Sequence, residues 1–328
     1  MTKLNIIGDI HGRQVWEKLL VPDAINIFVG DYFSPYVDIP YEACAENYNH
    51  IMELKKDNPD KIVTLIGNHD LDHWYSYDRG CSRHDYYNEA SIRKLFEDNK
   101  EHLQAAYCNG DVLVTHAGVS APWMARYTYK KSSNEVIDDF SFAMDYRDMK
   151  GEGVNDAKTI EDAIKAWTSG TDRELYLENG TMLFWKSSYW IYLNGVWTEM
   201  NFTPQSVCDF VNEMWVKNPE AFSFSMNKSR GDYYGHAVTH GPMWIRYEGL
   251  CDTNVFRGNP DYLQVYGHTQ SSNIEYYSDE TYHWKQWQID NTGKMVMVDC
   301  LGTVTKSLIV ELDDNGKVVK ISENVVEQ

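Results

Sequence analysis

The sequence predicts an α/β fold in which two β-sheets pack together as one sandwich. The first 120 residues alternate short apolar runs with helical patterns, which is typical of a buried, mainly parallel sheet. From Tyr262 onward, β-like runs are separated by turn sequences such as NTG and DDNG. Because the two halves meet at glycine-containing motifs, we expect residues 1–328 to form a single domain.

The first half of the chain should form four strands, each followed by a helix or a polar loop. The apolar runs LNII, NIFV, IVTLI and VLVT predict strands at 4–7, 26–29, 62–66 and 112–115. The segments between them predict helices at 13–20, about 40–57 and near 89–104. A polar, aromatic loop is expected after the third strand, ahead of the last of these helices.

The segment 121–235 has a different composition, rich in Trp, Tyr, Met, Asn and Ser, and we expect it to be an inserted cap. A helix should begin at Thr203-Pro204, since threonine is a good N-cap and proline suits the first helical position. The β-rich end of the chain predicts strands in LQVYG, NIEYY, HWKQWQID, KMVMVD and SLIVEL.

The composition of the chain indicates its cellular compartment and disfavours some classes of partner. A formal charge of −19 disfavours tight nucleic-acid binding, and 43% hydrophobic residues indicate a folded chain. No apolar run approaches the roughly 20 residues of a membrane span, and MTKLNIIGD lacks a signal-peptide layout. The six cysteines are scattered without a CxxC pair, which indicates free thiols and a cytoplasmic protein.

Metal-type side chains follow several predicted strands immediately. They occur in the sequences GDIHG, VGDYFS, IGNHD, VTHAG and VYGHTQ and comprise Asp9, His11, Asp31, Asn68, His69, His116 and His268. Functional groups gather at the carboxyl ends of strands in α/β folds, so we expect these side chains to converge. Oxygen and imidazole ligands without thiolate suit a pair of Mn, Fe or Zn ions, with one carboxylate shared between them.

In this order the motifs resemble those of the calcineurin-like metallophosphoesterase family, and most of all its branch of phosphoprotein phosphatases with bacterial and phage relatives. The resemblance spans residues 8–269 and implies a four-layered α/β/β/α sandwich. It implies that Asp9 and His11 bind one divalent metal and that Asp31 bridges two. Asn68, His116 and His268 would bind the second ion, and His69 would be the general acid. Manganese is the expected metal, with Fe, Zn or Ni as alternatives.

The resemblance implies hydrolysis of phosphate monoesters, including phosphoserine and phosphothreonine in proteins, by in-line attack of a hydroxide shared by two ions. One alternative is hydrolysis of a nucleotide, a dinucleoside polyphosphate or another phosphodiester. Another is a metal-binding scaffold without catalysis. In each enzymatic case we expect a phosphorylated partner and no membrane.

The second motif departs from the pattern GDxxDRG of the phosphoprotein phosphatases. Here the chain reads GDYFSPY, so Ser34 and Pro35 replace the Asp that supports the catalytic His and the Arg that grips phosphate. Other arginines are candidates for that contact: Arg246 in GPMWIR, Arg13 after the first motif, and Arg79 and Arg83 in YSYDRGCSRHD. Gln270 stands where many phosphodiesterases have a second His, which favours the phosphatase branch.

Overall fold

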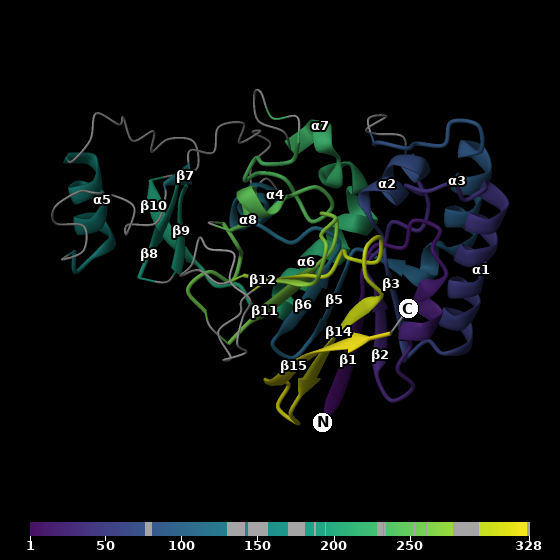
Figure 1. Ribbon diagram of the computed structural model, residues 1–328. Coiled ribbons are helices and arrows are strands. Elements are labelled where there is room, and N and C mark those ends of the chain that lie inside the picture. Colours follow the sequence, from purple (N-terminus) through teal and green to yellow (C-terminus); the bar gives the residue numbers. More distant parts are fainter. Residues whose placement is uncertain are drawn as a thin grey trace.

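The computed structural model describes residues 1–75, 81–129, 142–143, 157–169, 181–186, 188–193, 195–227, 232, 234–251, 253–259, 261–277 and 295–326. Two mixed sheets form its centre (Figure 1). The larger sheet has the order β15-β14-β1-β2-β3-β4, with β1 (Thr2–Ile7), β2 (Ile25–Phe28), β3 (Ile62–Leu65), β4 (Leu103–Gln104), β14 (Lys306–Leu312) and β15 (Val318–Val325). The second has the order β12-β13-β11-β6-β5, with β5 (Ala106–Asn109), β6 (Val112–Thr115), β11 (Leu263–Tyr266), β12 (Glu275–Tyr277) and β13 (Met295–Met297).

Each sheet has a parallel centre, with antiparallel strands at one edge of the larger sheet and at both edges of the second. Strands β1 to β4 pair in parallel, whereas β14 and β15 are antiparallel. In the second sheet β6, β11 and β13 are parallel, and β5 and β12 pair antiparallel. The predicted α/β fold with two mixed sheets is confirmed.

The two sheets pack face to face because alternate residues of their strands point into one shared core. Leu4 and Ile6 of β1 lie in the same buried cluster as Val112 and Val114 of β6. Ile7 of β1 and Leu113 of β6 fall outside that cluster and instead pack with helical residues. The sheets therefore form the two inner layers of the molecule.

Helices cover the outer faces. The helical elements are η1 (Val15–Leu19), α1 (Tyr41–Asp57), α2 (Asn68–Tyr75), α3 (Glu89–Asn99), η2 (Lys100–His102), α4 (Ala121–Tyr129), α5 (Ile160–Ser169), α6 (Pro204–Lys217), η3 (Pro219–Phe222), α7 (Phe224–Asn227) and α8 (Tyr247–Leu250). Trp16 and Tyr48 pack with Ile7, while Val207 and Val211 of α6 share the cluster of Leu113. None of the helices among the described residues combines the length and apolarity needed to cross a bilayer.

The segment 121–235 contributes both a separate sheet and part of an outer helical layer. Strands β7 (Phe142–Ala143), β8 (Met182–Trp185), β9 (Ser188–Leu193) and β10 (Val196–Met200) form the order β10-β9-β8-β7. In Figure 1 this sheet and α5 lie at the opposite end of the molecule from α1 and α3. Helix α6 instead joins the main body, where Asn212 Nδ2 donates to Ala106 O at 2.8 Å. A capping role for the segment stays a prediction.

Helix α2 was expected to be loop, and this expectation is wrong. Its sequence NHDLDHWY lacks an apolar stripe because residues 68–74 are all buried, with polar side chains turned into the structure rather than toward solvent. The predicted helix at 89–104 ends at Asn99, and Leu103 and Gln104 instead pair with β3. The helix expected at 13–20 is the shorter 3-10 helix η1.

Other elements show where local patterns were insufficient. The capped helix at Thr203 is confirmed, since its side chain accepts from Ser206 N and Pro204 is the first helical residue. Strands β5, β7, β8, β9, β10 and β15 were not predicted. The hairpin of β9 and β10 nonetheless has a local signal, since its aromatic and β-branched runs flank the pair Asn-Gly at 194–195. The strand expected in HWKQWQID lies outside the described residues.

Leu4 tests the core between the sheets because its side chain is fully buried there. The variant Leu4→Ala should lower the free energy of unfolding by about 2–5 kcal/mol, since it removes apolar contacts and leaves a cavity. Urea unfolding of the purified protein measures this loss. Val319→Ala on β15, where the side chain is 47% exposed, is the control and should change stability by less than about 0.5 kcal/mol.

Candidate metal centre

The motif residues converge because parallel strands of both sheets end beside one another. Asp9 and His11 follow β1, and Asp31 follows β2. Asn68 and His69 open α2 after β3, while His116 and His268 follow β6 and β11. Among the described residues, two groups have ligand atoms close enough together to hold a metal ion: His11 with Asp31 and His69, and Asp9 with Asp31 and His116.

Glycines allow these loops to touch. A Cβ on Gly67 would lie 2.1 Å from Asp31 Oδ1, and a Cβ on Gly267 would lie 2.2 Å from Asp9 Oδ1. His11, Asp31 and His268 adopt positive φ angles of 45°, 54° and 68°, a left-handed conformation that costs about 1–3 kcal/mol for such residues. The surrounding fold therefore holds three of the candidate ligands in strained backbone conformations.

Asp31 lies at the middle of the cluster. Its Oδ1 accepts from the His69 backbone N–H at 2.9 Å. Its Oδ2 is 3.6 Å from His116 Nε2, 3.7 Å from His11 Nε2 and 3.9 Å from His69 Nε2. One carboxylate thus faces three imidazoles that come from three different loops.

The imidazoles are oriented as metal ligands usually are, with one nitrogen held by the backbone. His11 Nδ1 lies 2.9 Å from Phe33 O, and His116 Nδ1 lies 2.9 Å from Val29 O. In each neutral ring an N–H at Nδ1 donates to that carbonyl, so Nε2 carries a lone pair. These lone pairs point toward the carboxylate of Asp31.

Asn68 extends the cluster toward His268. Its Oδ1 lies 2.8 Å from His116 Nε2 and 2.9 Å from His268 Nδ1. With the proton of His116 on Nδ1, its Nε2 and Asn68 Oδ1 present lone pairs to each other, which a cation between them or a rotated Asn68 amide would reconcile. Among the described residues, the buried atoms His268 Nε2 and His69 Nδ1 have no hydrogen-bond partner. These atoms fit a divalent metal site.

Burial shifts the pKa values of the carboxyls and imidazoles in the cluster. Burial and then the neighbouring Asp299 and Asp31 raise the pKa of Asp9 well above its usual value. Burial and then Asp70 do the same to the pKa of Asp31. Burial lowers the pKa of His11 to about 4 and that of His116 to about 3, so both imidazoles are neutral at pH 7.

Two functional residues were missed in the sequence. The Asp70 carboxylate accepts from the backbone N–H groups of Asp31 at 2.7 Å, Tyr32 at 2.9 Å and Gly67 at 2.9 Å. It therefore fixes the loop that carries Asp31. The carboxyl of Asp299 is hydrogen-bonded to that of Asp9, and burial raises its pKa to about 6. Asp299 follows strand β13 directly, which is the same pattern that identified Asp9 and Asp31.

The candidate general acid His69 lies inside the cluster rather than at its edge. Burial first, then His11 and His116, lower the pKa of its imidazole well below the usual value. Ser34 does not contact it: Ser34 Oγ lies 3.0 Å from His73 Nε2, one helical turn further along α2. The resemblance implies that residue 34 supports His69, whereas Ser34 here bonds to His73.

The two main candidate arginines border the cluster on the side of Asp299. The charges of Arg13 and Arg246 both oppose the rise in the pKa of Asp299. Arg246 Nη1 donates to Thr269 Oγ1 at 3.2 Å, and its Nε donates to Tyr234 O at 2.6 Å. Arg13 donates to Ile10 O at 3.5 Å. Arg79 lies outside the described residues.

Comparisons with known proteins give one family match and several similar solved structures. A sequence model of the calcineurin-like phosphoesterases matches residues 2–272. One similar solved structure is a cold-active protein-tyrosine phosphatase from a psychrophilic Shewanella species. It is 14% identical in sequence, the match covers 96% of this chain and 76% of that one, and the TM-score is 0.45. Another is a protein serine/threonine phosphatase from Saccharomyces cerevisiae, with 14% identity, coverage of 100% and 81%, and a TM-score of 0.41.

Binding of Mn²⁺ should release protons, because burial raises the pKa values of Asp9 and Asp31 and the metal competes with the protons that these carboxyls retain. For the same reason the apparent Mn²⁺ affinity should rise with pH, as protons compete less. Calorimetry in buffers of different ionisation enthalpy measures the release. A pH-independent affinity without proton release would contradict this electrostatic picture.

Removing the carboxylate behind Asp31 should weaken metal binding without removing a ligand. In Asp70→Asn the amide N–H₂ meets backbone donors, so the Asp31 loop loses its anchor. We expect the Mn²⁺ affinity to fall by about 10–100-fold. Asp98→Asn on α3, which removes only an exposed ion pair with Lys94, should leave the affinity unchanged.

Proposed function

This chain belongs to the calcineurin-like phosphoesterase family, and from that premise we propose that it is a dinuclear metal-dependent phosphatase acting on phosphate monoesters. As a calcineurin-like phosphoesterase it is a hydrolase. The observation that carries the proposal is the position of Asp31 Oδ2, within 3.6–3.9 Å of imidazole nitrogens from three loops. This carboxylate is shared by both candidate ligand groups.

The shared carboxylate supports two ions rather than one. As the resemblance implies, Asp9 and His11 would hold one ion, and Asn68, His116 and His268 would hold the other. This division differs from the two groups that distance defines, which place Asp9 with His116 and His11 with His69. Asp31 would contribute to both. Divalent cations at these positions would activate a water and offset the charge of the phosphoryl oxygens. Because the ligands are oxygens and imidazoles without thiolate, we propose manganese as the native metal, with Fe, Zn or Ni as alternatives.

His69 would supply the proton that the departing alkoxide needs. Its buried imidazole has a pKa well below the usual value, so it is neutral when the site holds no substrate. A phosphate ester placed beside it adds negative charge, which favours the protonated imidazole.

Arg246 and Arg13 would bind the phosphoryl oxygens. Arg246 donates to Thr269 Oγ1 next to His268, and Arg13 stands two residues after His11, so both arginines lie beside candidate ligands in the chain. A guanidinium presents paired N–H donors that match two phosphate oxygens. We propose phosphoserine and phosphothreonine in proteins as the substrate class, following the resemblance of the motifs to the phosphoprotein phosphatases.

We further propose that the protein works in the cytoplasm. All six cysteines are free thiols, and four of them are buried. Free buried thiols are typical of proteins in a reducing compartment.

The Asp31→Asn variant tests the shared carboxylate. It should lower kcat on a generic aryl phosphate with added Mn²⁺ by about 100-fold or more, because the amide binds cations far less well than the carboxylate. Asp209→Asn, an exposed change on α6, is the matched control and should keep wild-type turnover. Metal-loaded wild-type protein without turnover would contradict the phosphatase assignment and favour a scaffold.

The same assay separates the substrate classes. A phosphoserine peptide, a dinucleoside tetraphosphate and a bis-aryl phosphate should be compared at equal concentration. We expect the peptide to be hydrolysed fastest; faster hydrolysis of either other compound would favour a nucleotide hydrolase or a phosphodiesterase.

A further inference from the structure

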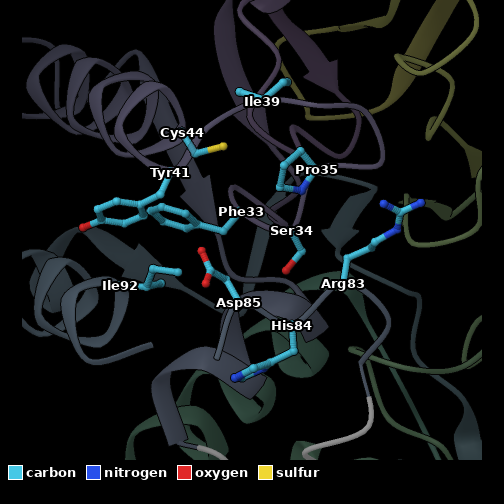
Figure 2. A pocket seen from close by; sticks show the side chains of 10 residues that line it. All are labelled: Phe33, Ser34, Pro35, Ile39, Tyr41, Cys44, Arg83, His84, Asp85 and Ile92. Carbon is cyan, nitrogen blue, oxygen red and sulfur yellow. The ribbon is translucent and has the colours of Figure 1, made fainter. Parts of the chain in front are cut away.

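The turn that follows β2 is tied to the loop that leads into α3. Tyr36 Oη and Ser82 Oγ are hydrogen-bonded at 3.1 Å, and Ser34 bonds to α2 through His73. A pocket of about 220 Å³ lies between the two segments, and its lining includes Ser34, Pro35, Arg83 and His84 (Figure 2). Residue 35, where the expected arginine is missing, therefore lies next to residue 83 in space.

Arg83 reaches from this loop toward the metal cluster. Its guanidinium carbon is 5.8 Å from the centroid of the Tyr36 ring. The same ring meets the imidazole of His11 edge to face at 4.8 Å and that of His69 at 6.2 Å. One aromatic ring thus separates the guanidinium from two residues of the candidate site. Figure 2 shows the guanidinium directed away from the other side chains that line the pocket.

Both loops hold strained backbone at this contact. Ser34 has φ 59° and Arg83 has φ 63°, and neither is a glycine. Such conformations are unfavourable for non-glycine residues and persist where surrounding contacts impose them, most often at functional sites. The Arg83 side chain that leaves this strained turn lies over the ring of Tyr36.

The charge of Arg83 has no counter-ion in the part of the chain that the structure describes. Its neighbour Arg93, by contrast, pairs with Glu89 at 2.8 Å. The cluster beyond Tyr36 contains the buried carboxyls of Asp9 and Asp31, so a phosphate ester entering it needs positive charge at the rim. An exposed guanidinium that has no carboxylate counter-ion among the described residues suits that need.

We propose that Arg83, positioned by the ring of Tyr36, binds the phosphate group of the substrate in place of the arginine that the second motif lacks at residue 35. This inference rests on the proposed phosphatase function. Arg83 would approach from the loop between α2 and α3, whereas Arg13 follows the first motif and Arg246 donates to Thr269 next to His268. The phosphate would then be held by arginines from separate segments of the chain.

The test measures inhibition by inorganic phosphate in the Mn²⁺-loaded enzyme with an aryl phosphate as substrate. Arg83→Gln should raise the inhibition constant and KM by about tenfold, the loss of one charge-assisted hydrogen bond, with a smaller change in kcat. Arg83→Lys should recover part of the affinity, since it keeps the charge without the planar fork. Arg93→Gln is the matched control and should behave as wild type.

Two variants of Tyr36 test whether its ring positions the Arg83 side chain. Tyr36→Phe keeps the ring and should retain most of the phosphate affinity, whereas Tyr36→Leu removes the ring and should weaken it severalfold. An unchanged inhibition constant in Arg83→Gln, with the metal content of wild type, would overturn the proposal. So would an equal effect of Arg93→Gln.

The outcome remains informative if the proposed function fails. Phosphate binding to the Mn²⁺-loaded protein is also measured by calorimetry, which needs no turnover. A wild-type protein that binds phosphate tenfold more tightly than Arg83→Gln but hydrolyses nothing would support Arg83 and contradict the phosphatase. Turnover by the wild type with equal phosphate binding in both proteins would do the reverse.

Discussion

The carboxylate of Asp31 is the constraint on which the site depends. It stands at the end of a buried parallel strand in a left-handed conformation. Its two oxygens are used differently: Oδ1 accepts from the first turn of α2, and Oδ2 faces three imidazoles. Gly67 leaves no room for a side chain beside it, and Asp70 binds its backbone. A short polar helix and two sheets are thus arranged around one side chain.

Burying so many carboxyls is unfavourable unless their charge is offset. Asp9, Asp31, Asp70 and Asp299 are all nearly inaccessible to solvent, and burial raises the pKa of each. The nearby imidazoles are neutral and contribute no compensating charge. Divalent cations would offset the buried negative charge, so metal binding and the stability of the fold are coupled. The metal-free site destabilises the fold most at a pH at which its carboxyls are ionised.

The second motif shows how a changed sequence is accommodated by neighbouring elements. Ser34 bonds to His73, and the ring of His73 stacks on that of His84 at 4.2 Å. His84 Nδ1 in turn lies 2.5 Å from Asp72 Oδ2. A buried polar chain therefore occupies the region in which the family pattern would place an acid and an arginine. This network links the turn after β2 to the loop that carries Arg83.

The sequence by itself determined the α/β class, the strand-end positions of the seven motif residues and the ligand chemistry of their side chains, because a strand and a ligand-type residue follow one another locally. The same pattern was available for Asp299 after β13. Tertiary structure alone decided that α2 is helical, that Asp70 holds the loop of Asp31, and that Ser34 bonds to His73. These features depend on contacts between loops far apart in the chain. Local periodicity does not encode such contacts, since a buried polar face has no apolar stripe.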